Sequence, residues 1–260
     1  IVALFIGKKY DYVFGFNVSA LTSMLPAVLI RKLYKKPVTL WAQDIWPDSV
    51  YAYGFKKTKF LSFCLNVFVK FMHFNIDNIA ISGKGFESKL KPYAKDGLSF
   101  NYLPNWADNL DMNLSAASLG DVSKVHFTFA GNVGRVQNLE NIIQAFNGLS
   151  NEYAKKSQLN VIGDGSALAD LKILNKKDNV VFHGKKPRDE MARYYKASDF
   201  LIVSLIDESI FSVTVPAKTQ TYIAAKKPIL AIINGDTADI IKDNNLGFFA
   251  SPSDVESIKN

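Results

Sequence analysis

The chain has 260 residues, of which 48% are hydrophobic and 21% are charged, and its mean hydropathy is +0.03. This composition excludes a disordered protein, and no apolar run reaches the roughly 18 residues that a membrane-spanning helix needs. The single cysteine, Cys64, excludes an internal disulfide, and the first residues lack the pattern of a signal peptide. We therefore expect a cytoplasmic protein of one or two domains.

The net charge of +7 predicts an anionic partner or substrate. The lysines occur in scattered pairs such as Lys56-Lys57 and Lys185-Lys186, whereas nucleic-acid binding favours a concentrated basic stripe. We therefore expect no nucleic acid. Two interpretations stay open: solvated lysines on helix ends and loops, or a membrane surface rich in anionic lipid.

Short apolar runs of strand length alternate with longer amphipathic segments, a pattern typical of βα units around a parallel sheet. The pattern occurs twice, with four strands expected in the first half and five in the second. The expected strands lie at 12–16, 38–42, 78–82, 98–103, 125–130, 159–162, 180–183, 200–205 and 229–233. The expected helices lie at 19–34, 58–75, 84–94, 138–149, 166–175, 188–197, 217–226 and 236–244.

The two halves predict two doubly wound α/β domains, at 1–120 and 121–260, that face a cleft. Pro104-Asn105-Trp106 and the polar stretch up to Ser123 have no clear period, so we interpret them as the connection. Ligands of such sheets bind at the carboxyl ends of the strands. The chain starts at Ile1 in what reads as the middle of a helix, so we expect the first domain to be incomplete at its N-terminus.

The most informative turn in the second half runs from Gly131 to Arg135, between an expected strand and an expected helix. Glycines at such a turn let backbone amides approach a phosphate, and Arg135 can offer a bidentate guanidinium. The alternative is a tight turn with a solvated arginine. Similar turns end the next two strands, at Gly163-Asp164-Gly165 and at Gly184-Lys185. Each could be a packing turn or surface loop, or could contact a ligand.

Lys218 begins an expected helix after the loop 207–217. A cation is unfavourable at a helix N-terminus unless an anion lies nearby, so Lys218 is a candidate for anion binding. In the first half, Asp44 lies between Trp41 and Trp46, and acidic groups beside aromatic rings suit a sugar. The alternative for that segment is the capped start of a helix.

The expected helix around 60–74 is apolar on nearly all sides and is preceded by Lys56, Lys57 and Lys59. A core helix is one interpretation. The other is an interfacial helix that presses its aromatic side chains into a membrane while the lysines meet lipid phosphates.

Taken together, these motifs resemble the retaining glycosyltransferases of family 4, which have the two-domain GT-B fold with Rossmann-like domains. The matching segments span nearly the whole chain, and their order is more specific than any one of them. They are Asp44-Ile45-Trp46-Pro47-Asp48-Ser49, Leu103-Pro104-Asn105-Trp106, Phe129-Ala130-Gly131-Asn132-Val133-Gly134, Val161-Ile162-Gly163-Asp164-Gly165 and Val215-Pro216-Ala217-Lys218. The chain is most similar to the transferases of N-acetylfucosamine-type amino sugars in bacterial surface-polysaccharide synthesis.

The resemblance implies a nucleotide-sugar donor, expected to be a UDP-sugar, held by the second domain, and a lipid-linked or nascent glycan acceptor held by the first. It implies retention of anomeric configuration, with no metal and no other cofactor, and peripheral contact with the inner membrane face. The implied catalytic residues are Asp44, Arg135 and Lys218. The implied donor-binding residues are Gly131, Asn132, Gly134, Gly163, Gly184, Lys185, Glu208, Ser209, Phe211 and Ser212.

The chain departs from the family pattern at three positions. Val213 and Thr221 stand where the family usually has two glutamates, and Gln43 stands where many members have a histidine. An alternative function is therefore a non-catalytic GT-B subunit that binds a nucleotide-sugar or a partner transferase.

Overall fold

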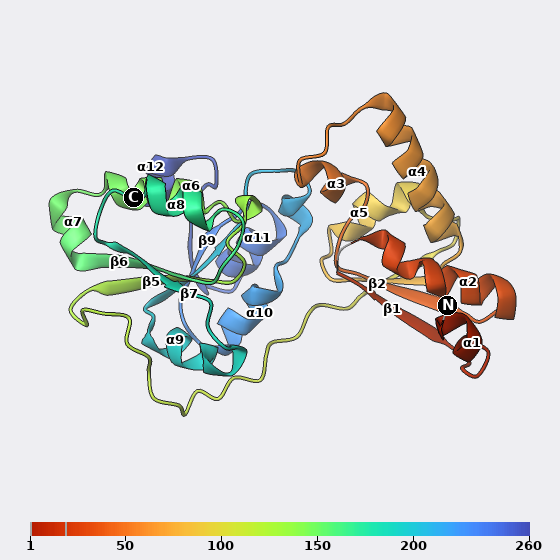
Figure 1. Cartoon of the computed structure of the whole chain (residues 1–260), viewed down its shortest axis with the longest axis horizontal. Helices are drawn as coiled ribbons and strands as arrows, with labels where there is room; N and C mark the ends of the chain where they lie inside the picture. Colours follow the sequence, from red (N-terminus) through yellow and green to blue (C-terminus); the bar gives the residue numbers. More distant parts are fainter. Residues whose placement is uncertain (1, 19) are drawn as a thin grey trace. The chain divides into compact units, whose positions relative to one another are not determined.

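A computed structural model describes residues 2–18 and 20–260, and the chain divides into two compact units (Figure 1). Unit 1 extends to Asn105, and unit 2 runs from Trp106 to Asn260. Each unit contains one parallel sheet flanked by helices, which confirms the predicted α/β class. None of the helices in the described ranges is long and apolar enough to span a bilayer.

The boundary between the units lies at 105/106, earlier than the predicted boundary at 120/121. The segment 106–120 lacks helices and strands but is held by unit 2. The Arg193 guanidinium donates to the Ser115 carbonyl over 3.1 Å, and the Ala117 amide donates to the Arg193 carbonyl over 3.0 Å. Leu119 is buried and its carbonyl accepts a hydrogen bond from Gln158. These anchors, which a polar sequence does not reveal, assign the segment to unit 2.

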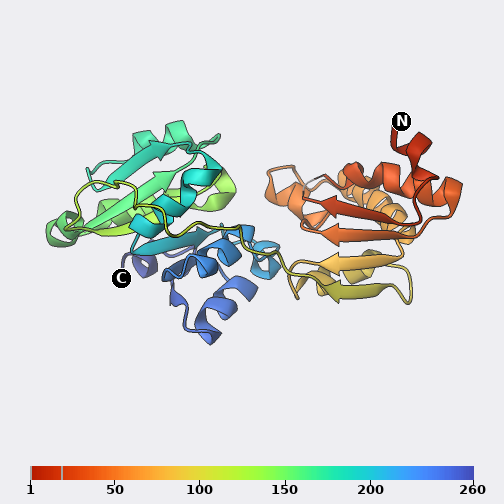
Figure 2. The ribbon, with the colours of Figure 1, turned by 90° about the horizontal axis from the view of Figure 1, so that it is seen from below.

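Unit 1 has a four-stranded parallel sheet of order β1-β2-β3-β4 (Figure 2). Because each crossover moves one strand in the same direction, right-handed connections place the linking helices on one face. This arrangement corresponds to one winding half of a doubly wound sheet. Its elements are α1 (Val2–Gly7), β1 (Val13–Asn17), the 3₁₀ helix η1 (Leu21–Met24), α2 (Leu25–Tyr34), β2 (Val38–Ala42), α3 (Asp48–Ala52), α4 (Lys59–Phe74), β3 (Asn78–Ile81), α5 (Phe86–Leu90), η2 (Lys91–Tyr93) and β4 (Ser99–Tyr102).

An ion pair ties helix α2 to the end of α4. The Arg31 guanidinium donates to both carboxylate oxygens of Asp77, over 2.9 and 2.6 Å, and the Val38 amide donates to the same carboxylate. The hydrogen bond from Arg31 lowers the pKa of Asp77 to about 2. A bidentate pair of this kind fixes geometry as well as adding energy, so α2 is held firmly beside β2 and β3.

Unit 2 has a six-stranded parallel sheet of order β10-β9-β8-β5-β6-β7, in which the winding direction reverses between β5 and β8. This is the doubly wound arrangement, with its topological switch point at β5/β8. Its elements are β5 (Val125–Ala130), η3 (Arg135–Gln137), α6 (Leu139–Gly148), α7 (Asn151–Lys156), β6 (Ser157–Ile162), α8 (Leu168–Leu174), β7 (Val180–Gly184), η4 (Arg188–Glu190), α9 (Met191–Ala197), β8 (Phe200–Ser204), η5 (Phe211–Val213), α10 (Ala217–Ala224), β9 (Ile229–Ile232), α11 (Asp236–Asp243), β10 (Gly247–Phe249) and α12 (Val255–Lys259).

The core of unit 2 explains why its strands are rich in apolar residues. Phe129, Val161 and Ile202, from β5, β6 and β8, are fully buried and pack with Ile142 and Ile143 of α6. Strands covered on both faces need no alternation of polar residues. The structure contains all five of the strands that the sequence predicts in this unit.

Candidate functional site

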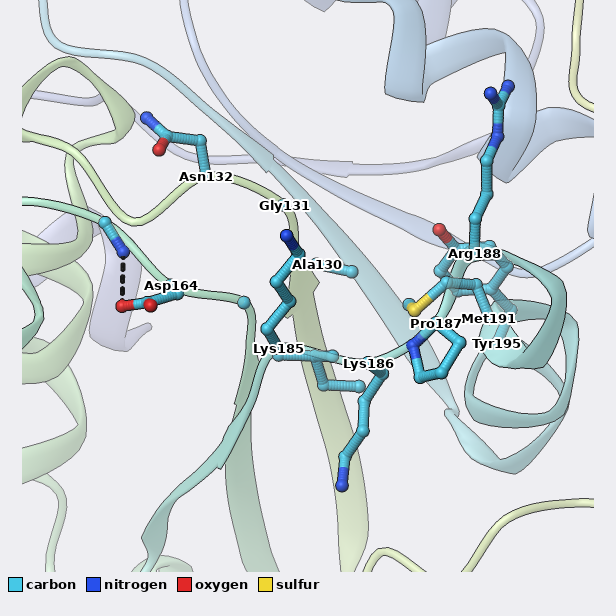
Figure 3. Close-up of a pocket in the computed structure, with 13 residues that line it drawn as sticks. Ala130, Gly131, Asn132, Asp164, Lys185, Lys186, Pro187, Arg188, Met191 and Tyr195 are labelled. Atoms are coloured by element: carbon cyan, nitrogen blue, oxygen red, sulfur yellow. Dashed lines mark hydrogen bonds between the residues drawn. The ribbon is translucent and has the colours of Figure 1, made fainter.

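A hollow of about 740 Å³ lies at the carboxyl ends of β5, β6 and β7, beside the switch point of the unit 2 sheet (Figure 3). Ligands of doubly wound sheets bind at this edge, and the volume is in the range of small-molecule sites. The described residues that line it are Ala130, Gly131, Asn132, Ile162, Gly163, Asp164, Gly165, Lys185, Lys186, Pro187, Arg188, Met191 and Tyr195. Of the sequence-predicted donor residues, the hollow therefore brings together Gly131, Asn132, Gly163 and Lys185.

Three of the strand-end glycines lock their loops together. Gly131, Gly163 and Gly184 all have positive φ angles, of 142°, 142° and 67°. The Gly131 amide donates to the Ile162 carbonyl, and the Gly163 amide donates to the Gly184 carbonyl, both over 2.9 Å. These two amides therefore hold neighbouring loops together, which agrees with the interpretation of Gly163-Asp164-Gly165 as a packing turn. Gly131 and Gly163 form the floor of the hollow, and at Gly163 the backbone of the Gly131 loop lies too close to admit a side chain.

A second pair of contacts extends this lock to the following helix. The Val133 amide donates to the Asp164 carbonyl over 2.9 Å, and the Ala167 amide donates to the Val133 carbonyl over 3.0 Å. Asp164 accepts a further hydrogen bond from the Gly165 amide, over 2.8 Å (Figure 3). The loops after β5 and β6 therefore behave as one structural element.

Lys218 lies beside this floor, in the first turn of α10. Its Nζ atom is 3.9 Å from the centre of the fully buried Phe129 ring. A Cβ added at Gly131 would come within 3.1 Å of Nζ. Burial of the ammonium group lowers the pKa of Lys218 to about 7. Within residues 2–18 and 20–260, no carboxylate forms an ion pair with Lys218. Lys218 is half-buried and does not line the hollow itself, but its ammonium group lies beside Gly131, where an anion in the hollow would stabilise it.

The outer wall of the hollow comes from the loop after β7 and from α9. Figure 3 shows Lys185 extending toward Gly131 and Lys186 pointing the other way. Arg188 forms an ion pair with Asp108 of the segment that connects the units. Tyr195 is buried, and this burial raises the pKa of its phenol to about 12, so it is a neutral group at this wall.

Arg188, Met191 and Tyr195 were not predicted as site residues. They are spaced three and four positions apart, a spacing that places side chains on one face of a helical segment. That periodicity, directly after the Gly184-Lys185 turn, is the signal in the sequence that identifies them.

Arg135 and Gly134 lie elsewhere than the resemblance implied. Both line a separate hollow, with Glu140 and Asp170, instead of the one that Gly131 lines. Arg135 begins η3 and is exposed. Arg135, which the resemblance assigned to the same diphosphate as Lys218, does not line the hollow that Gly131 lines.

The loop between β8 and α10 contributes no lining residue to the described hollow. Glu208 and Ser209 are exposed, and Phe211 is only 7% exposed because it packs into the core. Ser212 donates to the Ser209 carbonyl over 2.9 Å. These four predicted residues form a compact turn close in sequence to the switch strand β8.

Asp44 lies in unit 1, just after the carboxyl end of β2. Burial raises the pKa of its carboxyl group, while hydrogen bonds from Ser49 and from the Ile45 amide lower it. The Ile45 amide donates to Asp44 over 2.9 Å. The neighbouring Gln43 accepts a hydrogen bond from Asn105 over 2.8 Å, so it is held in a structural contact. Asp44 is thus a half-buried carboxyl group at a strand end, where an acid or base is placed in α/β proteins.

No three His, Cys, Asp or Glu side chains of the described residues lie close enough together to hold a metal ion.

The fold and the strand-end hollow define a doubly wound α/β protein with a candidate ligand site at the carboxyl ends of its strands. The family Glycosyl transferases group 1 matches residues 124–260, more than half of the chain, and the chain belongs to this family. It is 27% identical over 255 residues to the probable glycosyltransferase WbjE of Pseudomonas aeruginosa. The match covers 92% of this chain and 62% of WbjE, so the chain spans less than two thirds of that relative.

Solved structures share the fold. The HepE protein of Anabaena, in complex with UDP and glucose, has a TM-score of 0.74 at 12% identity over 100% of this chain and 69% of HepE. Sucrose-phosphate synthase of Thermosynechococcus elongatus has a TM-score of 0.74 at 14% identity over 97% of this chain and 63% of the synthase. The glycosyltransferase WaaG, involved in lipopolysaccharide biosynthesis, has a TM-score of 0.68 at 15% identity over 99% of this chain and 70% of WaaG. The chain therefore has the GT-B fold and belongs to the family Glycosyl transferases group 1.

Proposed function

We propose that the protein transfers a sugar from a UDP-sugar to a lipid-linked or nascent glycan in bacterial surface-polysaccharide synthesis. One observation carries this proposal. The Lys218 ammonium group lies beside Gly131 at the floor of the hollow, and none of the described carboxylates forms an ion pair with it. A diphosphate in the hollow would supply the missing counter-charge. HepE, which shares the fold, is described in complexes with UDP and with UDP-glucose, and this supports the choice of donor.

The proposed chemistry breaks the bond between the sugar C1 and the diphosphate oxygen and forms a bond from C1 to an acceptor hydroxyl oxygen. In the retaining course, the acceptor attacks from the face that the diphosphate leaves, and its proton passes to the departing phosphate oxygen. Negative charge grows on the diphosphate as the bond breaks, so a fixed cation at Lys218 lowers the barrier. Lys185, which extends toward Gly131, would add a second cation. No metal is needed in this scheme.

The test separates donor binding from folding. Lys218→Met keeps the length of the side chain and removes the charge, and the control is Lys242→Met. Lys242 also places its Nζ over a phenylalanine ring, 3.8 Å from the centre of Phe249, but it lies on α11 away from the hollow. We expect titration calorimetry to show UDP affinity at least about tenfold weaker in Lys218→Met and unchanged in the control. Equal affinities in both variants would contradict the role of Lys218.

A second candidate is a non-catalytic GT-B subunit that binds a nucleotide-sugar. Thr221, which stands at one of the two family glutamate positions, is buried in α10 and offers no carboxylate to a ligand. This candidate predicts UDP binding without turnover. Release of UDP from candidate UDP-sugars, measured with and without a glycan acceptor, distinguishes the two functions.

A further inference from the structure

Helix α4 exposes an apolar face. Phe60, Phe63 and Phe74 are 79%, 67% and 66% exposed, and Val67 and Phe71 are exposed between them. Steps of three and four residues place these five side chains along one side of the helix. A solvent-facing stripe of this composition is unusual, because the outer side of a surface helix normally carries polar residues.

The same helix also has a buried apolar face. Val69 and Met72 are fully buried, and His73 is 2% exposed. The core of unit 1 therefore accounts for one side of α4 only. The interpretation of this segment as a core helix and its interpretation as an interfacial helix are compatible, because they apply to opposite faces.

Helix α2 widens the exposed stripe. Leu25, Leu29 and Leu33 are exposed at steps of four residues. The Lys32 Nζ atom lies 4.6 Å from the centre of the Phe71 ring, which places the two helices side by side. We call these eight exposed apolar side chains the α2–α4 face: Leu25, Leu29 and Leu33 of α2, and Phe60, Phe63, Val67, Phe71 and Phe74 of α4. Since the Arg31–Asp77 ion pair fixes α2 beside the end of α4, the α2–α4 face belongs to the folded unit.

Lysines outnumber acidic residues around the α2–α4 face, where the carboxylates of Asp77 and Asp11 are paired with Arg31 and Lys36. Residues 49–76 contain Lys56, Lys57, Lys59 and Lys70 and no Asp or Glu. Residues 12–43 contain three lysines and one arginine and likewise no acidic residue. A cationic rim around exposed aromatic and aliphatic side chains complements an anionic, apolar partner.

We infer that the α2–α4 face docks on a membrane surface that carries anionic lipid. Aromatic and aliphatic side chains would enter the boundary between headgroups and acyl chains, and the lysines would meet lipid phosphates. A second copy of the chain fits less well. A symmetric contact through α4 would bring together two copies of residues 49–76, which carry four lysines and no acidic residue, and like charges at such a contact are unfavourable. The inference rests on the surface of unit 1 and not on the transfer reaction, so either can fail alone.

The experiment is co-sedimentation of the chain with two kinds of vesicle, one of phosphatidylcholine alone and one of equal parts phosphatidylcholine and phosphatidylglycerol. We expect binding to the anionic vesicles that weakens as salt is added, and little binding to the neutral ones. The double variant Phe60→Ser/Phe63→Ser should weaken binding at least about tenfold, because two aromatic side chains no longer enter the lipid. Replacing Lys56, Lys57 and Lys59 by glutamine should weaken it by about fivefold for each lysine.

The controls lie in unit 2. Ile173, on α8, is 81% exposed, so Ile173→Ser removes an exposed apolar side chain away from the α2–α4 face. Lys226→Gln/Lys227→Gln removes two adjacent lysines from the same unit. Both should bind vesicles like the parent chain, and thermal unfolding should confirm that the unit 1 variants remain folded.

Three results would overturn the inference. The first is absence of binding to anionic vesicles at low salt. The second is a dimer in light scattering that Phe60→Ser/Phe63→Ser dissociates, which would assign the α2–α4 face to a second copy. The third is binding by the 260-residue chain but not by a longer natural form of the protein, which would assign the α2–α4 face to an added segment.

Discussion

The carbonyl oxygen of Gly131 occupies the position that a side chain at Gly163 would need, because a Cβ built at Gly163 would lie 1.8 Å from that oxygen. The obstacle is backbone from the neighbouring loop, which cannot rotate away as a side chain could. The close packing of the two loops at the floor of the candidate site therefore requires a residue without a Cβ atom at position 163.

Gly163→Ala is accordingly expected to lower the free energy of unfolding of unit 2 by at least about 3 kcal/mol, through steric overlap as well as backbone strain. Gly184→Ala is the matched control. Gly184 also has a positive φ, of 67°, but an added Cβ there meets nothing within 4 Å, so only strain of about 1 kcal/mol is expected. Urea unfolding followed by circular dichroism checks both, and equal losses would show that close approach is not the constraint.

Binding of UDP should be accompanied by proton uptake. Lys218 has a pKa of about 7 in the free protein, and an anion beside it would favour its charged form and raise that pKa. Above the free pKa the site must therefore gain a proton to bind, so affinity should fall by up to about tenfold per pH unit. Calorimetry at about pH 8 in buffers of different ionisation enthalpy measures the uptake. The uptake should vanish in Lys218→Met, and a pH-independent affinity would contradict this prediction.

Arg135 and Lys185 offer a contrast between family resemblance and geometry. Arg135 lines a different hollow, whereas Lys185 lines the candidate site and extends toward Gly131. We expect Arg135→Ala to leave the UDP dissociation constant within about twofold and Lys185→Ala to raise it by about fivefold. The opposite ranking would restore Arg135 to the diphosphate site.

Asp44→Asn should separate stability from activity. Because burial raises the Asp44 pKa, the folded state holds that proton more tightly than the unfolded chain, and the resulting stabilisation is lost as pH rises through the folded pKa. Asn carries no such charge, so the variant should gain thermal stability relative to the parent at neutral pH and not at acidic pH. Melting temperatures at both pH values check this sign.

The same substitution is expected to leave UDP binding unchanged and to lower the rate of transfer to the acceptor in the full protein, because Asp44 lies in unit 1 and the donor hollow in unit 2. Loss of UDP binding in Asp44→Asn would place this residue on the donor instead.

The sequence predicts the buried parts of the fold well. The strand Val125–Ala130 was expected with its observed bounds, because its apolar and β-branched residues run directly into Gly131. Three short elements were not expected: α7, β10 and α12. β10 has three residues, and Phe248 and Phe249 on it are exposed, so it shows neither length nor alternation.

The sequence predicts the residues of the site that directly follow strands, but not those that other elements contribute. Turn glycines such as Gly131 and Gly163 follow strands directly, and local sequence therefore places them at the strand ends. Tyr195 lines the hollow from helix α9, whereas Arg135 lines a different hollow. The side chains that meet in the hollow depend on hydrogen bonds between neighbouring loops, such as the one from the Val133 amide to the Asp164 carbonyl. No local sequence pattern predicts such a contact.

The lock between the loops after β5, β6 and β7 also bears on how a ligand is received. Successive backbone hydrogen bonds, from Gly131 to Ile162 and from Gly163 to Gly184, arrange the floor when the unit folds and leave little to be ordered later. A preorganised surface lets even a small ligand retain most of its contact energy. Inorganic pyrophosphate alone should therefore bind measurably beside Lys218, without the base and sugar that a flexible site would need in order to close.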